Sequence, residues 1–134
     1  MPRALTGAAD LICNACLDRK RSYYWVAAGA YNADDYAFRF VGDGAFRESV
    51  GHGAFATVLF GYRNGKGRIL GWWGLFHEVG KKAWAMEALA VDFALEVALN
   101  PRLLPRLENP APADLIDLVD RAALPWTTVE GKGT

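Results

Sequence analysis

The sequence predicts an α+β domain in which an antiparallel sheet of about four strands, built from two hairpins, packs against three helices. Two long apolar runs on either side of a glycine-rich turn predict one hairpin, and two aromatic-rich runs before them predict the other. Three further segments have the apolar content and spacing of helices. The expected strands are residues 22–29, 36–41, 54–62 and 68–77, and the expected helices are residues 6–20, 79–99 and 113–123.

The hairpin formed by residues 54–77 has the strongest signal in the chain. Its turn, Asn64-Gly65-Lys66-Gly67, contains glycines that take the positive φ angles of tight hairpin turns. Both alternating faces of residues 54–62 are apolar, which is typical of a strand that is covered on both sides. We therefore expect the rest of the domain to pack around this hairpin.

Trp72 and Trp73 are adjacent on the second strand of this hairpin, so their rings point to opposite faces of the sheet. One interpretation is that both rings are buried, one under each layer of helices. The alternative is that one ring lies on the surface and anchors a partner, because Trp is enriched in binding hot spots. A glycine flanks the pair on each side, which indicates a bulge or a close approach of another segment.

The segments before the central hairpin are predicted from capping and turn residues. Thr6 is a suitable N-cap for the first helix, and a basic cluster at residues 19–21 suits its C-terminal end. Residues 22–29 and 36–41 are expected to pair as the second hairpin, across a turn at residues 30–35. Residues 42–53 contain four glycines and are expected to be a mobile loop.

The expected helix at residues 79–99 is apolar around most of its circumference. Its charged side chains fall mainly on one narrow stripe, which contains Lys81, Lys82, Asp92 and Glu96, and Glu87 is the exception. A helix of this kind is buried on several sides. We expect it to be covered by the sheet and, in addition, by other helices of the chain or by the same helix of a second chain.

The last part of the chain is expected to hold one short helix. Three prolines make residues 102–112 an irregular arm, and residues 113–123 follow as an amphipathic helix that ends at Pro125. The predicted domain spans residues 1–126, and residues 127–134 form a flexible tail.

Composition excludes several classes of function. Fifteen basic residues balance fifteen acidic ones, so the chain lacks the positive charge of a general nucleic-acid binder. No apolar run reaches the roughly 18–20 residues that a membrane span needs. Two cysteines and the absence of a signal-peptide pattern favour the cytoplasm. No motif for a cofactor is present, and we expect none to be bound.

Two clusters of residues suggest chemistry. His52 and Glu48 in the expected loop, with His77 and Glu78 at the end of the hairpin, would form an acid–base site if the fold brought them together. This site would belong to a small enzyme, or to a domain that binds a small molecule in a pocket beside residues 42–53.

A zinc site is a weaker alternative. Cys13, Cys16, His52 and His77 supply enough ligands for tetrahedral zinc, but the two histidines are much farther apart than in common structural sites. The Cys-x-x-Cys pair also lies within an expected helix with no strand before it, unlike redox motifs of this form. Two buried helical cysteines explain the pattern equally well.

Surplus apolar surface is the basis of the leading hypothesis. A monomer seldom exposes as much contiguous apolar area as the central hairpin and the long helix offer together. We therefore expect an assembly protein without catalytic activity, which forms a homo-oligomer or packs into a larger complex, such as a bacterial or phage particle. The expected contact residues are Trp72, Trp73, Phe76 and Trp84.

Overall fold

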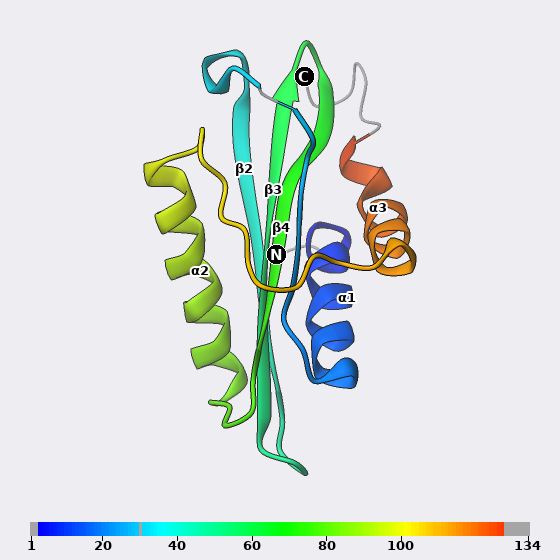
Figure 1. Ribbon diagram of the computed structural model, residues 1–134, viewed down its shortest axis with the longest axis vertical. Helices are drawn as coiled ribbons and strands as arrows, with labels where there is room; N and C mark the ends of the chain where they lie inside the picture. The colour runs from blue at the N-terminus through cyan, green and yellow to red at the C-terminus, as the bar shows by residue number, and fades with distance from the viewer. Residues whose placement is uncertain (1–2, 30, 128–134) are drawn as a thin grey trace.

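Four antiparallel strands form a long sheet with helices on both faces (Figure 1). The structure, a computed structural model, describes residues 3–29 and 31–127, with side chains from residue 6 onward. The elements are α1 (Arg3–Arg19), β1 (Tyr23–Val26), the 3-10 helix η1 (Ala33–Asp35), β2 (Ala37–Arg47), β3 (His52–Arg63), β4 (Lys66–His77), α2 (Ala83–Leu99) and α3 (Ala113–Thr127). The strand order is β1-β4-β3-β2, with α1 and α3 on one face and α2 on the other. The predicted α+β class is thus confirmed.

The central hairpin forms as predicted. β3 and β4 pair over their whole length and are joined by a two-residue turn, Asn64-Gly65. Both turn residues have positive φ angles, 55° for Asn64 and 77° for Gly65, as the tightest hairpin turns require. The pairing register shifts between Leu59 and Phe60, which leaves Leu70 as an extra residue in β4, directly before Gly71.

The predicted hairpin between residues 22–29 and 36–41 is wrong. β1 pairs with β4, and β2 pairs with β3 along all of its residues. The tight turn at residues 48–51 makes β2 and β3 a hairpin, because it costs less entropy to close than the longer link between β1 and β2. The three-stranded sheet of β2, β3 and β4 still has one open edge on β2 and one on β4. β1 pairs with the edge of β4, where the irregular arm that follows α2 bonds to its other side.

The predicted loop at residues 42–53 is also wrong, because β2 continues through Gly42 and Gly44 to Arg47. These glycines allow α2 to lie directly on the strand. A Cβ atom at Gly44 would be 2.2 Å from the backbone nitrogen of Glu87, and one at Gly42 would be 3.1 Å from the Cβ of Ala90. Their role is close packing between a helix and a strand.

The helix boundaries differ in small ways from those predicted. α2 begins at Ala83, after a short link in which the Gly80 N–H donates to the carbonyl of Gly51. α3 continues through Pro125 to Thr127. The predicted tail at 127–134 therefore begins with a helical residue, and residues 128–134 lie outside the described part of the chain.

The irregular arm between α2 and α3 crosses the sheet at the edge formed by β1 (Figure 1). The Tyr24 N–H donates to the carbonyl of Asn109, and the Ala111 N–H donates to the carbonyl of Tyr24. These bonds occupy backbone groups on the outer edge of β1. The arm therefore protects this edge from pairing with another chain.

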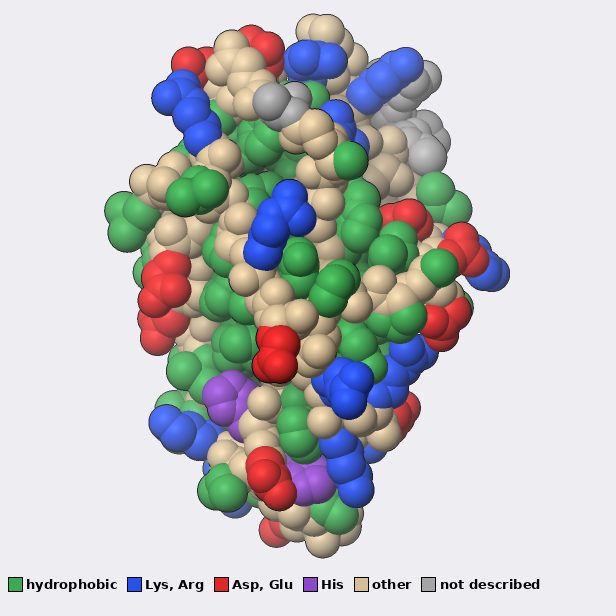
Figure 2. Space-filling view, in the orientation of Figure 1, with side chains coloured by type: hydrophobic (Ala, Val, Ile, Leu, Met, Phe, Trp, Pro, Cys, Tyr) green, Lys and Arg blue, Asp and Glu red, His purple; other side chains and the backbone are tan. Residues whose placement is uncertain are grey.

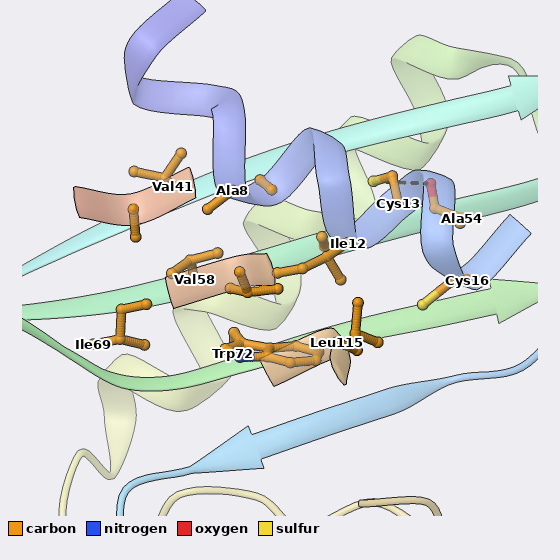
Figure 3. Close-up of a cluster of buried hydrophobic side chains, with 14 of the residues drawn as sticks. Ala8, Ile12, Cys13, Cys16, Val41, Ala54, Val58, Ile69, Trp72 and Leu115 are labelled. Atoms are coloured by element: carbon orange, nitrogen blue, oxygen red, sulfur yellow. Dashed lines mark hydrogen bonds between the residues drawn. The ribbon is translucent and has the colours of Figure 1, made fainter. Parts of the chain in front are cut away.

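The core has one layer on each side of the sheet. Trp72 lies on the side of α1 and α3, and Figure 3 shows it beside Leu115, with Ile12 and Cys16 above the same layer. Trp73 lies on the side of α2, where its ring is 5.5 Å from that of Phe93. Both indoles are fully buried, so the first interpretation of the Trp pair is confirmed.

Candidate protein interface

The expected contact residues lie in three different environments. Trp72 and Trp73 are inside the domain and offer no surface to a partner, which corrects that part of the expected interface. Phe76 is half-buried on the side of α1. Its backbone N–H donates a hydrogen bond of 2.8 Å to the hydroxyl of Ser22. Trp84 is 75% exposed and is the only exposed residue of the five tryptophans, all of which the structure describes.

Trp84 begins an apolar stripe on the outer face of α2, which we call the α2 seam. The seam consists of Trp84, Ala88, Val91, Leu95 and Leu99. Trp84 is 75% exposed, Val91 54%, Leu95 60% and Leu99 86%. Spacings of three and four residues place these side chains on one side of a helix, as in the seams of coiled coils.

The opposite face of α2 packs on the sheet through Met86, Ala90 and Val97, which are buried. The Thr57 hydroxyl donates to the carbonyl of Ala90 at 2.8 Å, which ties the helix to β3. The sheet therefore covers one side of α2 only. The second cover that we expected for this helix is not supplied by the described residues of the chain, since the seam is exposed.

Charged residues border the α2 seam. Lys81 and Lys82 lie at the N-terminal end of α2, where Lys82 is the N-cap residue. Asp92 and Glu96 lie toward the other end, and all four side chains belong to exposed residues. Figure 2 shows green hydrophobic side chains extending to the left margin of the molecule, where Figure 1 places α2, with red acidic side chains among them.

An open hollow of about 680 Å³ extends the seam toward β2. It is lined by Phe46 of β2, by residues 80–82, and by Trp84, Ala85, Ala88 and Leu89 of α2. The lining is mostly apolar, with the two lysines at its rim. This shape suits an apolar side chain that carries an acidic neighbour.

The two histidines do not form a pair. They lie at the same end of the sheet, but Gly53 is the cross-strand partner of His77, so His52 and His77 point to opposite faces. The His52 ring lies 5.1 Å from that of Phe76, and the His77 ring lies 5.7 Å from that of Phe55. The acid–base site therefore lacks its central contact.

The two glutamates of that site are exposed on separate segments. Glu48 lies in the turn between β2 and β3, and Glu78 lies in the link that follows β4. The loop beside which we expected a pocket is largely strand β2. The geometry thus gives no enclosed cluster of these four side chains.

His77 provides a test of the packing around this end of the sheet. Burial of its ring, with the positive charge of Lys81 as a smaller cause, lowers the pKa of His77 below 6.5, its usual value. Its Nε2 atom is buried without a hydrogen-bond partner among the described residues. The unfolded chain therefore binds this proton more readily than the folded chain does.

We expect the free energy of unfolding to be highest above pH 6.5 and to decrease as the pH falls below that value, and His77→Phe to weaken this dependence. Urea unfolding of both proteins, followed by circular dichroism between about pH 7.5 and pH 5.5, measures the effect. The range avoids more acidic conditions, where Asp43 acts oppositely because burial raises its pKa. An unchanged pH dependence in His77→Phe would contradict the assignment.

Cys13 and Cys16 lie on the side of α1 that faces the sheet and are fully buried (Figure 3). The Cys13 thiol contacts the carbonyl of Ala54 at 3.9 Å and that of Asp43 at 3.4 Å. Burial raises the pKa of the Cys13 thiol strongly and that of Cys16 to about 12, so both remain protonated at neutral pH. Thiols in this state are poor nucleophiles and poor metal ligands.

The zinc alternative gains no geometric support. Among the described residues, no group of three or more Cys, His, Asp or Glu side chains is arranged to hold a metal ion. Cys13 and Cys16 face the core, whereas His77 faces the opposite side of the sheet. The interpretation of the Cys-x-x-Cys pair as core residues is the one that fits the burial.

Sequence reasoning missed Val91, Leu95 and Leu99 as surface residues. Their spacing places them on one face of the helix, but the apolar residues around them do not indicate which face is the outer one. The signal was the position of the charged stripe, since Asp92 and Glu96 lie next to the seam and Met86, Ala90 and Val97 lie opposite.

Comparison with known proteins adds no assignment. Within the described residues, no helix combines the length and the apolar character needed to cross a membrane. No protein-family model matches the chain, and no match was found among curated proteins or among solved structures.

Proposed function

We propose that this chain is a protein-interaction subunit without catalytic activity, which docks a protein partner on the α2 seam and thereby self-associates or joins a larger complex. The observation that carries the proposal is the exposure of four large apolar side chains on one face of a helix, with Leu99 86% and Trp84 75% exposed. Single exposed apolar residues are common on protein surfaces, but a continuous row of them marks an interaction site.

The energetic argument rests on the area that docking removes from water. Complete burial of a Leu or Val side chain is favourable by about 1.5–3 kcal/mol. Trp84, Leu95 and Leu99 retain most of their surface in the monomer, so their burial by a partner offsets part of the cost of association. Trp is also among the residues that contribute most to interface energies.

A photo-crosslinking amino acid at Leu95 tests the proposal, with the same amino acid at Asp117 as a control. Leu95 lies in the seam, and Asp117 is an exposed residue of α3 on the other side of the sheet. Irradiation in the native cells is expected to attach a protein to position 95 and not to position 117. No protein adduct at position 95, or equal adducts at both positions, would overturn the proposal.

Leu95→Lys is expected to abolish the association of the chain while leaving its fold intact. Leu95 is 60% exposed, so the free energy of unfolding should change by less than about 0.5 kcal/mol. A charge at this position would be buried without a partner in the complex, which is strongly unfavourable. Sedimentation velocity measures the association, and urea unfolding at low protein concentration measures the stability.

The matched control is Asp117→Glu, a change of similar exposure on the opposite side of the domain. It should alter neither association nor stability. A Leu95→Lys chain that associates as well as the unchanged chain would contradict the role of the seam.

A further inference from the structure

We infer that the partner on the α2 seam is a second copy of this chain, with the two α2 helices packed antiparallel across a two-fold axis that passes near Ala88. This inference rests on the proposed function and names the partner of the same surface. It follows from three features of the seam: the order of its charges, the sizes of its side chains, and the position of the hollow beside it.

The charges along the seam are complementary when two copies of α2 run in opposite directions. Lys81 and Lys82 lie at the N-terminal end of α2, and Asp92 and Glu96 lie on the same side of the helix toward its C-terminal end. A two-fold axis perpendicular to two antiparallel helices brings the same flank of each helix together. The lysines of one chain then lie opposite the carboxylates of the other, at both ends of the pair.

A parallel arrangement loses this match. Its two-fold axis runs along the helices and brings opposite flanks together, so the flank that carries Lys81, Lys82, Asp92 and Glu96 faces the Glu87 flank of the other chain. The lysines of one chain then no longer lie opposite Asp92 and Glu96 of the other, and the electrostatic complementarity that orients two chains is absent. Glu87 lies on the other flank of the helix and is exposed, where solvent screens it from its copy. The charge order therefore selects the antiparallel pair.

The side-chain sizes suit a crossing at Ala88. A small residue at the crossing point allows the two helix backbones to approach closely. With the axis there, Trp84 of one chain lies at the level of Asp92 of the partner subunit, between the seam residues Val91 and Leu95. The Trp84 ring of each chain thus packs on the aliphatic side chains at this level of the other chain. The two-fold axis forms the same contact at both ends of the pair.

Exposed apolar residues outside the helix extend the same match. Leu99 at the end of α2 reaches past the start of the partner helix, toward Val79 in the link before it. Val79 is 88% exposed and Leu99 86%, so these are the two most exposed of the large apolar residues described. Leu95 of one chain lies at the level of the hollow of the other chain, which is lined by Phe46, Trp84 and residues 80–82. The two lysines of that hollow are opposite in charge to Glu96, which follows Leu95.

The size of the contact sets the concentration at which the dimer should be observed. α2 has 17 residues and is therefore about 25 Å long at 1.5 Å per residue. A single pair of helices of this length buries less area than a standard stable interface, so we expect dissociation constants in the micromolar range, on the order of 1–100 µM.

Charge reversal tests the pairing of the two ends. One variant carries Lys81→Glu and Lys82→Glu, and the other carries Asp92→Lys and Glu96→Lys. Each variant alone should dimerise roughly tenfold more weakly or worse, and an equimolar mixture should associate about as strongly as the unchanged chain. Sedimentation velocity over the micromolar range provides the readout, and added salt should reduce both the loss and the rescue.

Cysteine pairing tests the orientation of the two helices independently of their charges. Lys81→Cys in one chain and Glu96→Cys in another should form a mixed disulfide when the two chains are oxidised together. Cys13 and Cys16 are fully buried and should not compete. Disulfides between two copies of the same variant, formed in preference to the mixed species, would overturn the antiparallel arrangement.

The outcomes separate this inference from the proposed function. A chain that remains monomeric at about 200 µM, while position 95 crosslinks to a different protein, overturns the second copy as partner and leaves the interaction function standing. A chain that remains monomeric and forms no adduct at position 95 overturns both. Dimerisation that survives both charge reversals and Leu95→Lys also overturns the inference, because another surface then forms the dimer.

Discussion

Trp73→Ala is expected to lower the free energy of unfolding by about 3–5 kcal/mol, a large part of the stability of a domain of this size. Trp73 is fully buried between β4 and α2, where its ring covers Gly71 and contacts that of Phe93. Its Nε1 donates a hydrogen bond of 2.9 Å to the carbonyl of Pro105. The substitution removes the ring, the contact with α2 and the hydrogen bond to the irregular arm together.

A comparison with Trp72 separates the hydrogen bond from the loss of the ring. Trp72 is equally buried, but its Nε1 has no hydrogen-bond partner among the described residues. Trp73→Phe should therefore cost about 1 kcal/mol more than Trp72→Phe, because only the first change leaves a carbonyl without its donor. Urea unfolding followed by circular dichroism measures both variants. Equal costs would contradict the role given to Pro105.

The two tryptophans also show which parts of the fold the sequence determines on its own. Alternation along a strand places adjacent side chains on opposite faces, and the turn Asn64-Gly65 specifies the register of its hairpin. These local rules predicted that the two indoles point to opposite faces of the sheet, as observed. The partner of β1 depends on contacts between distant segments, and no local pattern distinguishes the open edge of β4 from that of β2.

The glycines of β2 show why the candidate site was only partly predictable. Gly42 and Gly44 have the composition of a flexible loop, and a single sequence does not show that a helix will lie against them. The contact that explains them comes from Ala90 and Glu87, more than forty residues later in the chain. Once α2 is fixed on this surface, its opposite side, the α2 seam, is necessarily the outer one.

Gly44→Ala is expected to lower the free energy of unfolding by about 3 kcal/mol, the upper part of the range for overpacked sites. The added Cβ would lie 2.2 Å from the backbone nitrogen of Glu87 and 2.5 Å from the carbonyl carbon of Met86. Both are backbone atoms of α2, so no side-chain rotation relieves the clash, and the whole helix must move away from β2. Thermal and urea unfolding of the variant measure the loss.

Gly7→Ala is the matched control, because it adds the same methyl group to a glycine with space around it. The nearest atom to a Cβ at Gly7 is the carbonyl oxygen of Ala122 at 3.9 Å, and the residue lies within α1. Alanine favours a helix over glycine by about 0.5–1 kcal/mol, so this variant should be slightly more stable. Because α2 carries the seam on its outer side, Gly44→Ala should also weaken association, whereas Gly7→Ala should not. A Gly44→Ala chain with unchanged stability would mean that α2 does not rest on β2 at this position.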